Sequence, residues 1–420
     1  MSGWKHERRA VITGMGVIAP NGNDLVTFWE SVRDGRSAAR TLTRFELGDL
    51  PSRVAAEVRD FDLAQYTDPR KVRRFDLSIQ YALAASKLAM MDAGGTGGIC
   101  DPERMGIIEG TSVGGMESSF KGQTAFERRG YRQMSPFTLI NAYTGGGAGE
   151  IALELGIHGH AASYSSGSAS GSDVIGYALR MIRDDEADVM VAGGAEAPLL
   201  APLWGAFCRT QVMTTRNDTP ASAMRPFDTT RDGFVLGEGA GFVVLEELSH
   251  ALARGARIYA EVVGHGRACE AYHSVAPHPN GVGIRSAMER ALRDAEMAPM
   301  DVNYVNAHGT ATEMNDKAEL TAINGLFGEH SGRLSVSSTK PVTGHLLAAA
   351  GAVETIVTAL ALHHQTIPQT ANLIVPEDRG VLDLVAGKSR PYPIHVAMNL
   401  SVGFGGKNAC LVLKRYDAHR

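Results

Sequence analysis

Cysteine is scarce in this chain of 420 residues, where it occurs four times, at Cys100, Cys208, Cys269 and Cys410. No two of these residues have the C-x-x-C spacing of a metal site, and no disulfide framework is evident. Scattered cysteines of this kind fit a reducing compartment. We therefore expect a cytoplasmic protein that has no metal site.

Long apolar runs are missing as well. The most apolar stretch, residues 346–362, contains Glu354 and two threonines and is too short to span a membrane easily. The first ten residues, MSGWKHERRA, are charged and lack the apolar core of a signal peptide. We expect residues 346–362 to form a buried helix, and we expect no association with a membrane.

The chain also has no excess of positive charge. It contains 41 Lys and Arg against 46 Asp and Glu, which gives a formal net charge of −5. This balance argues against whole-surface attraction to nucleic acid, although it leaves room for a local basic patch. The hydrophobic share of 44% is typical of a soluble globular protein.

Short apolar runs alternate with amphipathic stretches, which is the pattern of an α/β protein with buried strands. The first strand is expected to end at Gly14 and the third at Gly193. The order of elements restarts near residue 250, so we expect two successive α/β halves, 1–250 and 251–420, although their sequences show little similarity. Strands are expected at residues 10–13, 106–108, 188–192, 242–245, 258–263, 304–307, 334–337, 396–398 and 409–413, and helices at 173–183, 281–295 and 346–362.

Four short segments stand out because each follows a predicted strand or precedes a predicted helix. Active sites of α/β folds collect at such strand ends. The segments are SSGSASGS at residues 165–172, NAHGTAT at 306–312, SSTKPVTGH at 337–345 and GFGGKN at 403–408.

Two histidines and a lysine in these segments form the first candidate site. Taken singly, His308 is equally well explained as a capping residue at a turn, and His345 has the alternative explanation of a helix cap. Lys340 alone is better explained as a solvated lysine. The start of the following helix is expected to lower the pKa of His345 and favour its neutral form. Together, two neighbouring imidazoles can donate hydrogen bonds to one developing oxyanion, as an enolate or a tetrahedral intermediate at a thioester requires.

The Ser/Gly segment is the second candidate. It is either a turn of small residues where backbones pack closely, or a nucleophile elbow whose hydroxyl lies at the amino end of a helix over 171–183. It lacks the G-x-S-x-G spacing of hydrolases.

These segments, together with TGMGV at 13–17, DVMVAGGAE at 188–196 and RPFDTTRDGFVLGEGAG at 225–241, resemble the elongating β-ketoacyl-acyl carrier protein synthases almost end to end. The resemblance implies a thiolase-like α/β fold of two pseudo-duplicated βαβαβαββ halves in α-β-α-β-α layers. It also implies a dimer, with a homodimer favoured, and an acyl carrier protein as partner. The carrier brings the substrate on its phosphopantetheine, so no separate cofactor is expected.

The resemblance also assigns roles to individual residues. His308 and His345 match the two catalytic histidines, and Lys340 matches the lysine that supports them electrostatically. Phe404 matches the residue whose N–H contributes to the oxyanion hole and whose ring gates the pocket. The remaining matches are the threonines that bind the pantetheine arm (Thr310 and Thr312), the acidic residues that hold the lysine and its loop (Asp316 and Glu319), and the basic patch that docks the acidic carrier (Arg70, Arg73 and Arg74).

The chain departs from the family pattern at the nucleophile. Counting eight residues back from Gly176 gives the position of the family's cysteine, and this residue is Ser168. A thiol titrates near neutrality, whereas a serine hydroxyl stays protonated unless a base contacts it. We therefore expect condensation, which needs a covalent acyl-enzyme, to be impaired or lost. A second departure is Val402, where the family commonly has an aromatic residue.

Decarboxylation of a malonyl thioester needs only the two histidines. A serine at this position is similar to the decarboxylases of polyketide β-branching cassettes, which act beside a hydroxymethylglutaryl-type synthase. We therefore predict conversion of malonyl-carrier to acetyl-carrier and CO2. Two alternatives stay open: a non-catalytic partner like the chain-length factors, which usually lose the histidine pair, and an acyltransferase that uses Ser168 as nucleophile.

Overall fold

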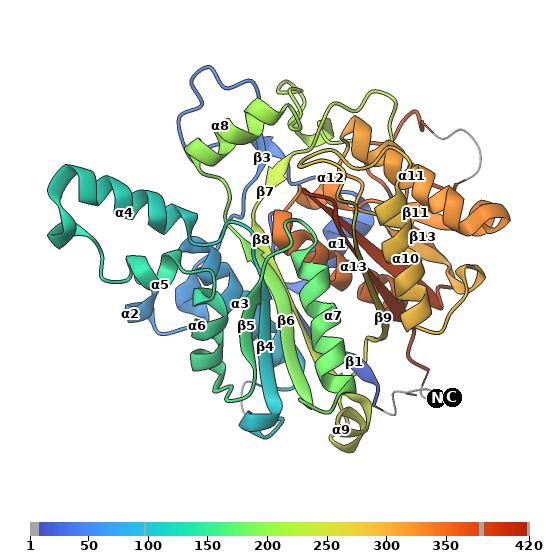
Figure 1. Ribbon diagram of the computed structural model, residues 1–420, viewed down its shortest axis with the longest axis horizontal. Coiled ribbons are helices and arrows are strands. Elements are labelled where there is room, and N and C mark those ends of the chain that lie inside the picture. Colours follow the sequence, from blue (N-terminus) through green and yellow to red (C-terminus); the bar gives the residue numbers. More distant parts are fainter. Residues whose placement is uncertain (1–7, 96–97, 378–381, 418–420) are drawn as a thin grey trace.

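The computed structural model describes residues 8–95, 98–377 and 382–417, so most of the charged amino-terminal segment lies outside the described residues. A ten-stranded mixed sheet runs through the molecule in the order β11-β10-β14-β15-β9-β1-β8-β6-β4-β5 (Figure 1). Its strands are β1 (Ala10–Ile18), β4 (Met105–Gly110), β5 (Ala161–Tyr164), β6 (Val189–Glu196), β8 (Gly239–Glu247), β9 (Ala260–Cys269), β10 (Tyr304–Asn306), β11 (Ser335–Ser337), β14 (Val396–Gly403) and β15 (Lys407–Lys414).

The two halves of the sheet have the same topology. Within each set of five strands, the spatial order is first, fifth, fourth, second, third along the chain. The three outer strands of each half run parallel, and the two inner strands pair antiparallel. Strands β1 and β9 join the halves by antiparallel pairing. This repetition confirms the predicted duplication, whereas the domain boundary at residue 250 stays a prediction because the sheet is continuous.

Four helices complete the layers. Helix α3 (Leu77–Asp92) covers the outer face of the first half, and α10 (Val282–Asp294) covers that of the second (Figure 1). Helices α7 (Ser170–Arg183) and α13 (Ala350–His364) pack on each other and contact strands of both halves. The result is the predicted α-β-α-β-α arrangement, with α7 and α13 as the central layer.

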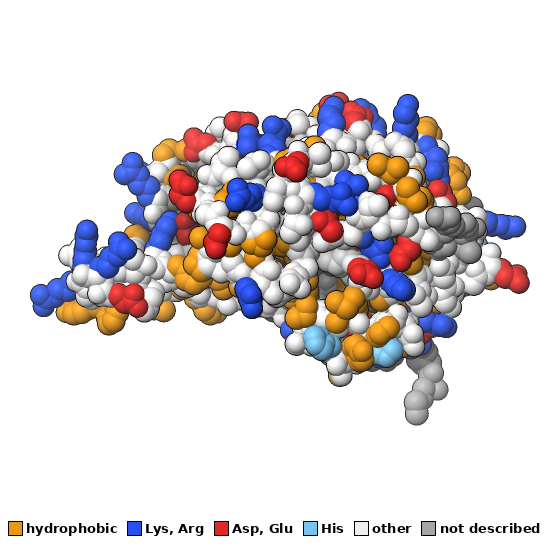
Figure 2. All heavy atoms as spheres, turned by 90° about the horizontal axis from the view of Figure 1, so that it is seen from above, with side chains coloured by type: hydrophobic (Ala, Val, Ile, Leu, Met, Phe, Trp, Pro, Cys, Tyr) orange, Lys and Arg blue, Asp and Glu red, His pale blue; other side chains and the backbone are white. Residues whose placement is uncertain are grey.

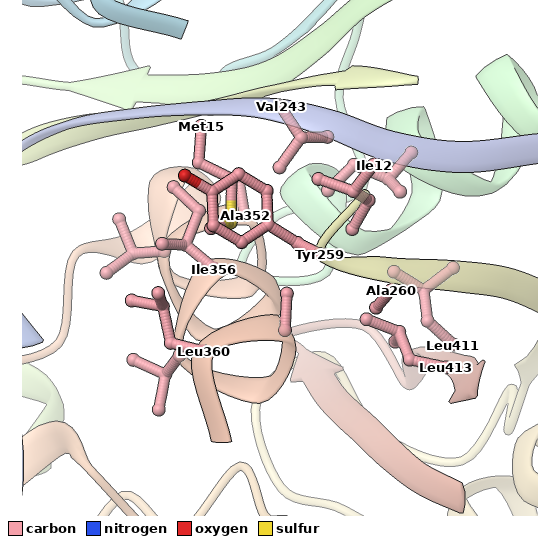
Figure 3. Close-up of a cluster of buried hydrophobic side chains, with 14 of the residues drawn as sticks. Ile12, Met15, Val243, Tyr259, Ala260, Ala352, Ile356, Leu360, Leu411 and Leu413 are labelled. Atoms are coloured by element: carbon pink, nitrogen blue, oxygen red, sulfur yellow. The ribbon is translucent and has the colours of Figure 1, made fainter. Parts of the chain in front are cut away.

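Helix α13 lies in the main hydrophobic core. Ala352, Ile356 and Leu360 on this helix face Met15 of β1 and Tyr259, the residue just before β9 (Figure 3). The stretch Leu347–His364 is long and apolar enough to cross a membrane, but 89% of it is buried inside the protein. It is therefore the core helix that the sequence predicted, although its α-helical part begins at Ala350.

Glycines inside the strands let the outer helices approach the sheet. A Cβ on Gly14 would stand 2.2 Å from the carbonyl oxygen of Ala89 in α3, and one on Gly264 would stand 2.3 Å from that of Ala291 in α10. The expectation that the first strand ends at Gly14 was wrong, because β1 continues to Ile18. Strand β6 likewise continues past Gly193.

A projecting arm formed by α4 (Met116–Arg129) and α5 (Thr138–Ala142) extends from the first half (Figure 1). Basic and hydrophobic side chains gather at this end of the molecule (Figure 2), where Phe126 and Leu139 are exposed. Such exposed apolar groups are typical of an interaction surface. The predicted dimer stays a prediction.

The remaining elements surround this framework. They are α1 (Leu25–Asp34), α2 (Pro69–Val72), α6 (Gly146–Leu155), α8 (Ala201–Thr210), α9 (Leu248–Ala253), α11 (Glu313–Phe327) and α12 (Lys340–Thr343), a small sheet of β2 (Arg40–Thr41), β3 (Val54–Ala56) and β7 (Leu236–Gly237), and the pair β12 (Thr366–Ile367) and β13 (Arg390–Pro391).

Candidate active site

Ser168 lies in the tight turn between β5 and α7. Gly167 adopts a left-handed conformation, with φ of 66°, which the turn requires and which other residues rarely adopt. The Ser168 side chain is partly buried, and its Oγ lies 3.1 Å from Nε2 of His345. The Ser/Gly segment therefore presents a hydroxyl at the amino end of α7, next to an imidazole.

The two histidines come from separate segments of the second half. His308 follows β10, and His345 follows α12. Both side chains are buried, and their ring centroids lie 5.3 Å apart with the planes at 84°. The fold therefore brings Ser168, His308 and His345 together, as the sequence predicted. The two rings are close enough to donate to one substrate atom.

Lys340 fixes the proton of His308. Its ammonium nitrogen lies 3.2 Å from Nδ1 of His308, and it also donates to the carboxylate of Glu354. An ammonium group only donates hydrogen bonds, so Nδ1 of His308 must accept. The proton of the neutral ring is then on Nε2, where it is available as a donor.

Glu354 was not predicted to belong to the site. It is the carboxylate partner of a fully buried lysine, and burial raises its pKa. The sequence contained one signal for it, because Glu354 is the only charged residue in the apolar run 346–362. A charge inside a core helix needs a partner of opposite charge.

Both imidazoles are held in their neutral form. Burial lowers the pKa of His308 well below its ordinary value, and the Lys340 ammonium and the neighbouring His345 ring lower it further. Burial and then the charge of Lys340 lower the pKa of His345. The direction agrees with the expectation for His345, but the cause differs, because α13 begins five residues later.

Asp316 and Glu319 hold the turn that carries His308. Glu319 accepts from the backbone N–H groups of His308 at 2.6 Å and Gly309 at 2.8 Å. Asp316 accepts from the N–H of Ala311 at 3.2 Å, a residue with a left-handed φ of 63°. Burial raises the pKa of Glu319 to about 8 and that of Asp316 to about 6. Their hydrogen bonds go to loop backbone and to the Asn315 amide, whereas Glu354 accepts from the lysine.

A narrow cavity of about 60 Å³ lies between Ser168 and the two histidines. Its walls include Ser168, both histidines, Thr310, Thr312, Val402 and Phe404. The hydroxyl oxygens of Thr310 and Thr312 lie 2.8 Å apart. The Phe404 side chain is 44% exposed, and its backbone nitrogen faces the Ser168 turn, 3.8 Å from where a Cβ on Gly167 would stand.

A buried polar network of three side chains next to the Ser168 turn was also missed. The Ser166 hydroxyl donates to Asp173 at 2.6 Å, and Nε2 of His265 lies 3.1 Å from the other oxygen of Asp173. All three side chains are buried. No spacing in the sequence indicated that residues 173 and 265 meet.

The predicted carrier-docking arginines lie on the surface at α2, outside the cavity. Arg70 is paired with Asp68 at 2.6 Å, and the Arg74 guanidinium lies 5.4 Å from the Phe137 ring centroid. Arg73 is exposed. The structure thus places these residues together, and their docking role stays a prediction.

Comparisons with known proteins agree with this architecture. Residues 7–251 match the beta-ketoacyl synthase N-terminal domain, and residues 259–374 match the C-terminal domain of that family. The 3-oxoacyl-(acyl-carrier-protein) synthase 2 of Coxiella burnetii is 42% identical over 97% of this chain and 99% of its own length. That of Synechocystis is 39% identical over 98% of this chain and 99% of its own.

Solved structures are similar over the same extent. The ishigamide ketosynthase/chain length factor has a TM-score of 0.90 at 34% identity, with 98% of this chain and 100% of that chain covered. A type II PKS acyl-carrier protein in complex with its ketosynthase has a TM-score of 0.89 at 31% identity, with 97% and 100% covered. Because both family domains match in order and full-length relatives align almost end to end, this chain belongs to the beta-ketoacyl synthase family.

Proposed function

We propose that this protein decarboxylates malonyl-acyl carrier protein to acetyl-acyl carrier protein and CO2. The observation that supports this most is the pair of neutral, buried imidazoles facing a serine hydroxyl where the family resemblance places a cysteine. The donors for an enolate are present, and the thiol for an acyl-enzyme is not.

The geometry suggests how the reaction proceeds. His308 and His345 donate from Nε2 to the thioester oxygen of the malonyl group. The bond between C2 and the carboxylate carbon breaks, and CO2 leaves. The electron pair of the broken bond stays with C2 and forms the enolate, which the two N–H groups stabilise. C2 then takes a proton from water, which gives acetyl-carrier. The Lys340 ammonium keeps His308 in the donating tautomer throughout.

The pantetheine arm would enter along Thr310 and Thr312, whose hydroxyls line the cavity. The exposed arginines Arg70, Arg73 and Arg74 would bind an acidic carrier protein. One structural neighbour is a ketosynthase in complex with an acyl-carrier protein, which supports this choice of partner. The substrate brings its own phosphopantetheine, and a role beside a hydroxymethylglutaryl-type synthase in β-branching fits the product.

Mass measurement of the intact carrier tests the proposal. Purified protein incubated with malonyl-carrier should yield acetyl-carrier. His308→Ala should lower the rate by at least about a hundredfold, while Ser168→Ala should keep most of it. An unchanged malonyl-carrier, or a rate that His308→Ala does not affect, would refute decarboxylation. The curated relatives are named as synthases, so β-ketoacyl products should be measured in the same samples.

A second candidate function rests on the 3.1 Å contact between Ser168 Oγ and His345 Nε2. If His345 accepts the hydroxyl proton, Ser168 can attack a thioester carbon, form an ester and release the carrier thiol. Intact-protein mass spectrometry would then detect an acyl adduct with wild type and none with Ser168→Ala. An adduct that transfers to a second acceptor would favour an acyltransferase over a decarboxylase.

A further inference from the structure

An arginine-lined hollow of about 430 Å³ lies on the surface beside the carboxyl-terminal half of α7. Four guanidinium groups surround it, from Arg180 on α7, Arg267 on β9, and Arg290 and Arg293 on α10. Four arginines around one hollow are unexpected in a chain with a net charge of −5. The hollow is lined by none of the residues of the active-site cavity.

The positive charge of the arginine hollow is not balanced within the protein. In the described part of the chain, the Arg180 and Arg293 side chains have no hydrogen-bond or ion-pair partner. Arg267 donates to the Tyr177 hydroxyl and lies over its ring, and Arg290 donates to a backbone carbonyl at 2.8 Å. Neither contact neutralises a guanidinium, and clustered like charges repel one another unless an anion lies between them.

Among the described residues, one carboxylate lines the hollow, and it is already engaged. Asp294 pairs with Arg183 at 3.1 Å and accepts from the backbone N–H of His265 at 2.8 Å, through the same oxygen. His265 also lines the hollow, but its ring nitrogen Nε2 lies 3.1 Å from an oxygen of Asp173 and is therefore engaged as well. The hollow is therefore rich in unused donors and poor in acceptors.

We infer that the arginine hollow is a binding site for a small molecule that carries two or more phosphate groups. Guanidinium forks match phosphate oxygens two at a time, and four of them suit a compact, multiply charged group. A volume of about 430 Å³ is in the range of small-molecule sites. This site is separate from the proposed decarboxylation site, and the inference does not depend on it.

Calorimetric titration of the full-length protein with pyrophosphate at low salt tests the inference. We expect saturable binding that weakens as salt rises. Arg180→Gln/Arg293→Gln should weaken it by at least about tenfold, because two charge-assisted contacts are lost. Neither side chain holds any other part of the structure, so this variant is expected to fold normally.

A matched variant and two further ligands make the test specific. Arg40→Gln/Arg209→Gln removes the same charge from exposed positions on β2 and α8, and it should bind pyrophosphate like the wild type. ADP binding more tightly than pyrophosphate would identify a nucleotide as the ligand, and equal binding would identify the diphosphate alone. No binding, equal losses in both double variants, or tighter binding of citrate than of pyrophosphate would overturn the inference.

Discussion

Lys340 depends on Glu354 because both groups are buried and each compensates the other's charge. Glu354→Gln would leave a buried ammonium without a counter-charge. We expect this variant to lose about 3 kcal/mol of unfolding free energy, measured by denaturant titration. The double variant Lys340→Met/Glu354→Leu should be closer to wild type. A Glu354→Gln protein as stable as the wild type would contradict this account of the pair.

Glu109 at the end of β4 provides a pH-dependent prediction. Burial raises its pKa to about 7, and the one side chain among the described residues that bonds to it is Ser163, whose hydroxyl lies at 3.1 Å. The folded protein therefore binds this proton more tightly than the unfolded chain, whose glutamate titrates near pH 4.5. The stability contributed by the protonated group is present below about pH 4.5 and is lost as pH rises through about 7.

Glu109→Gln removes this titration. Relative to wild type, the variant should gain about 3 kcal/mol of unfolding free energy between pH 4.5 and pH 8. Denaturant titrations at both pH values measure this difference. The exposed control Glu186→Gln should show none, and a pH-independent difference between Glu109→Gln and wild type would contradict the shifted pKa.

The sequence predicted the residues of the site better than their partners. His308, His345, Lys340 and Ser168 lie in short motifs at strand ends, where position in the chain almost fixes position in the fold. Glu354 was missed because which carboxylate meets Lys340 depends on how α13 packs. The pair Asp173–His265 is separated by 92 residues, so only tertiary packing brings it together.

At the scale of elements, two strand glycines in each half set the distance between sheet and helix: Gly14 and Gly16 against α3, and Gly264 and Gly266 against α10. A Cβ on Gly266 would stand 2.1 Å from the carbonyl oxygen of Ala287 in α10. Gly266→Ala should therefore push α10 outward and cost at least about 2 kcal/mol of unfolding free energy. Gly205→Ala in α8, where a Cβ meets nothing within 4 Å, should be neutral or stabilising by up to about 1 kcal/mol. Equal stability of the two variants would refute the close-packing explanation.

Close packing at strand glycines also explains why the predicted strand ends were wrong. A glycine after an apolar run usually indicates a turn, and the sequence analysis interpreted Gly14 and Gly193 in this way. In the structure these residues continue their strands, because the absence of a side chain serves close packing: a helix approaches at Gly14, and strand β8 at Gly193. Local pattern cannot separate these two uses of glycine, since the difference lies in what packs on the other side.

At the scale of the whole molecule, the site forms where the two halves meet. Ser168 comes from the first half, and the two histidines and Lys340 come from the second. The repeated order of elements made two α/β halves predictable. Their junction was not predictable from composition, because the antiparallel pairing of β1 with β9 and the central layer of α7 and α13 are long-range contacts.

Net charge also acts on the whole molecule. A chain of charge −5 repels an acidic carrier protein at long range, so docking must depend on local positive charge. Arg73 is exposed on the surface that we propose for the carrier. Arg73→Glu should raise the KM for malonyl-carrier roughly tenfold and leave kcat unchanged, because it alters encounter and not chemistry.

Two measurements separate this docking effect from a general effect of charge. Arg40→Glu makes the same change on β2, and its KM should stay within about twofold of wild type because the Debye length at physiological salt is about 8 Å. The KM of wild type should rise with salt, and that of Arg73→Glu should rise less, since it has already lost an attractive contact. If both variants raise KM equally, the effect is one of general charge and the docking role of the basic surface at α2 is refuted.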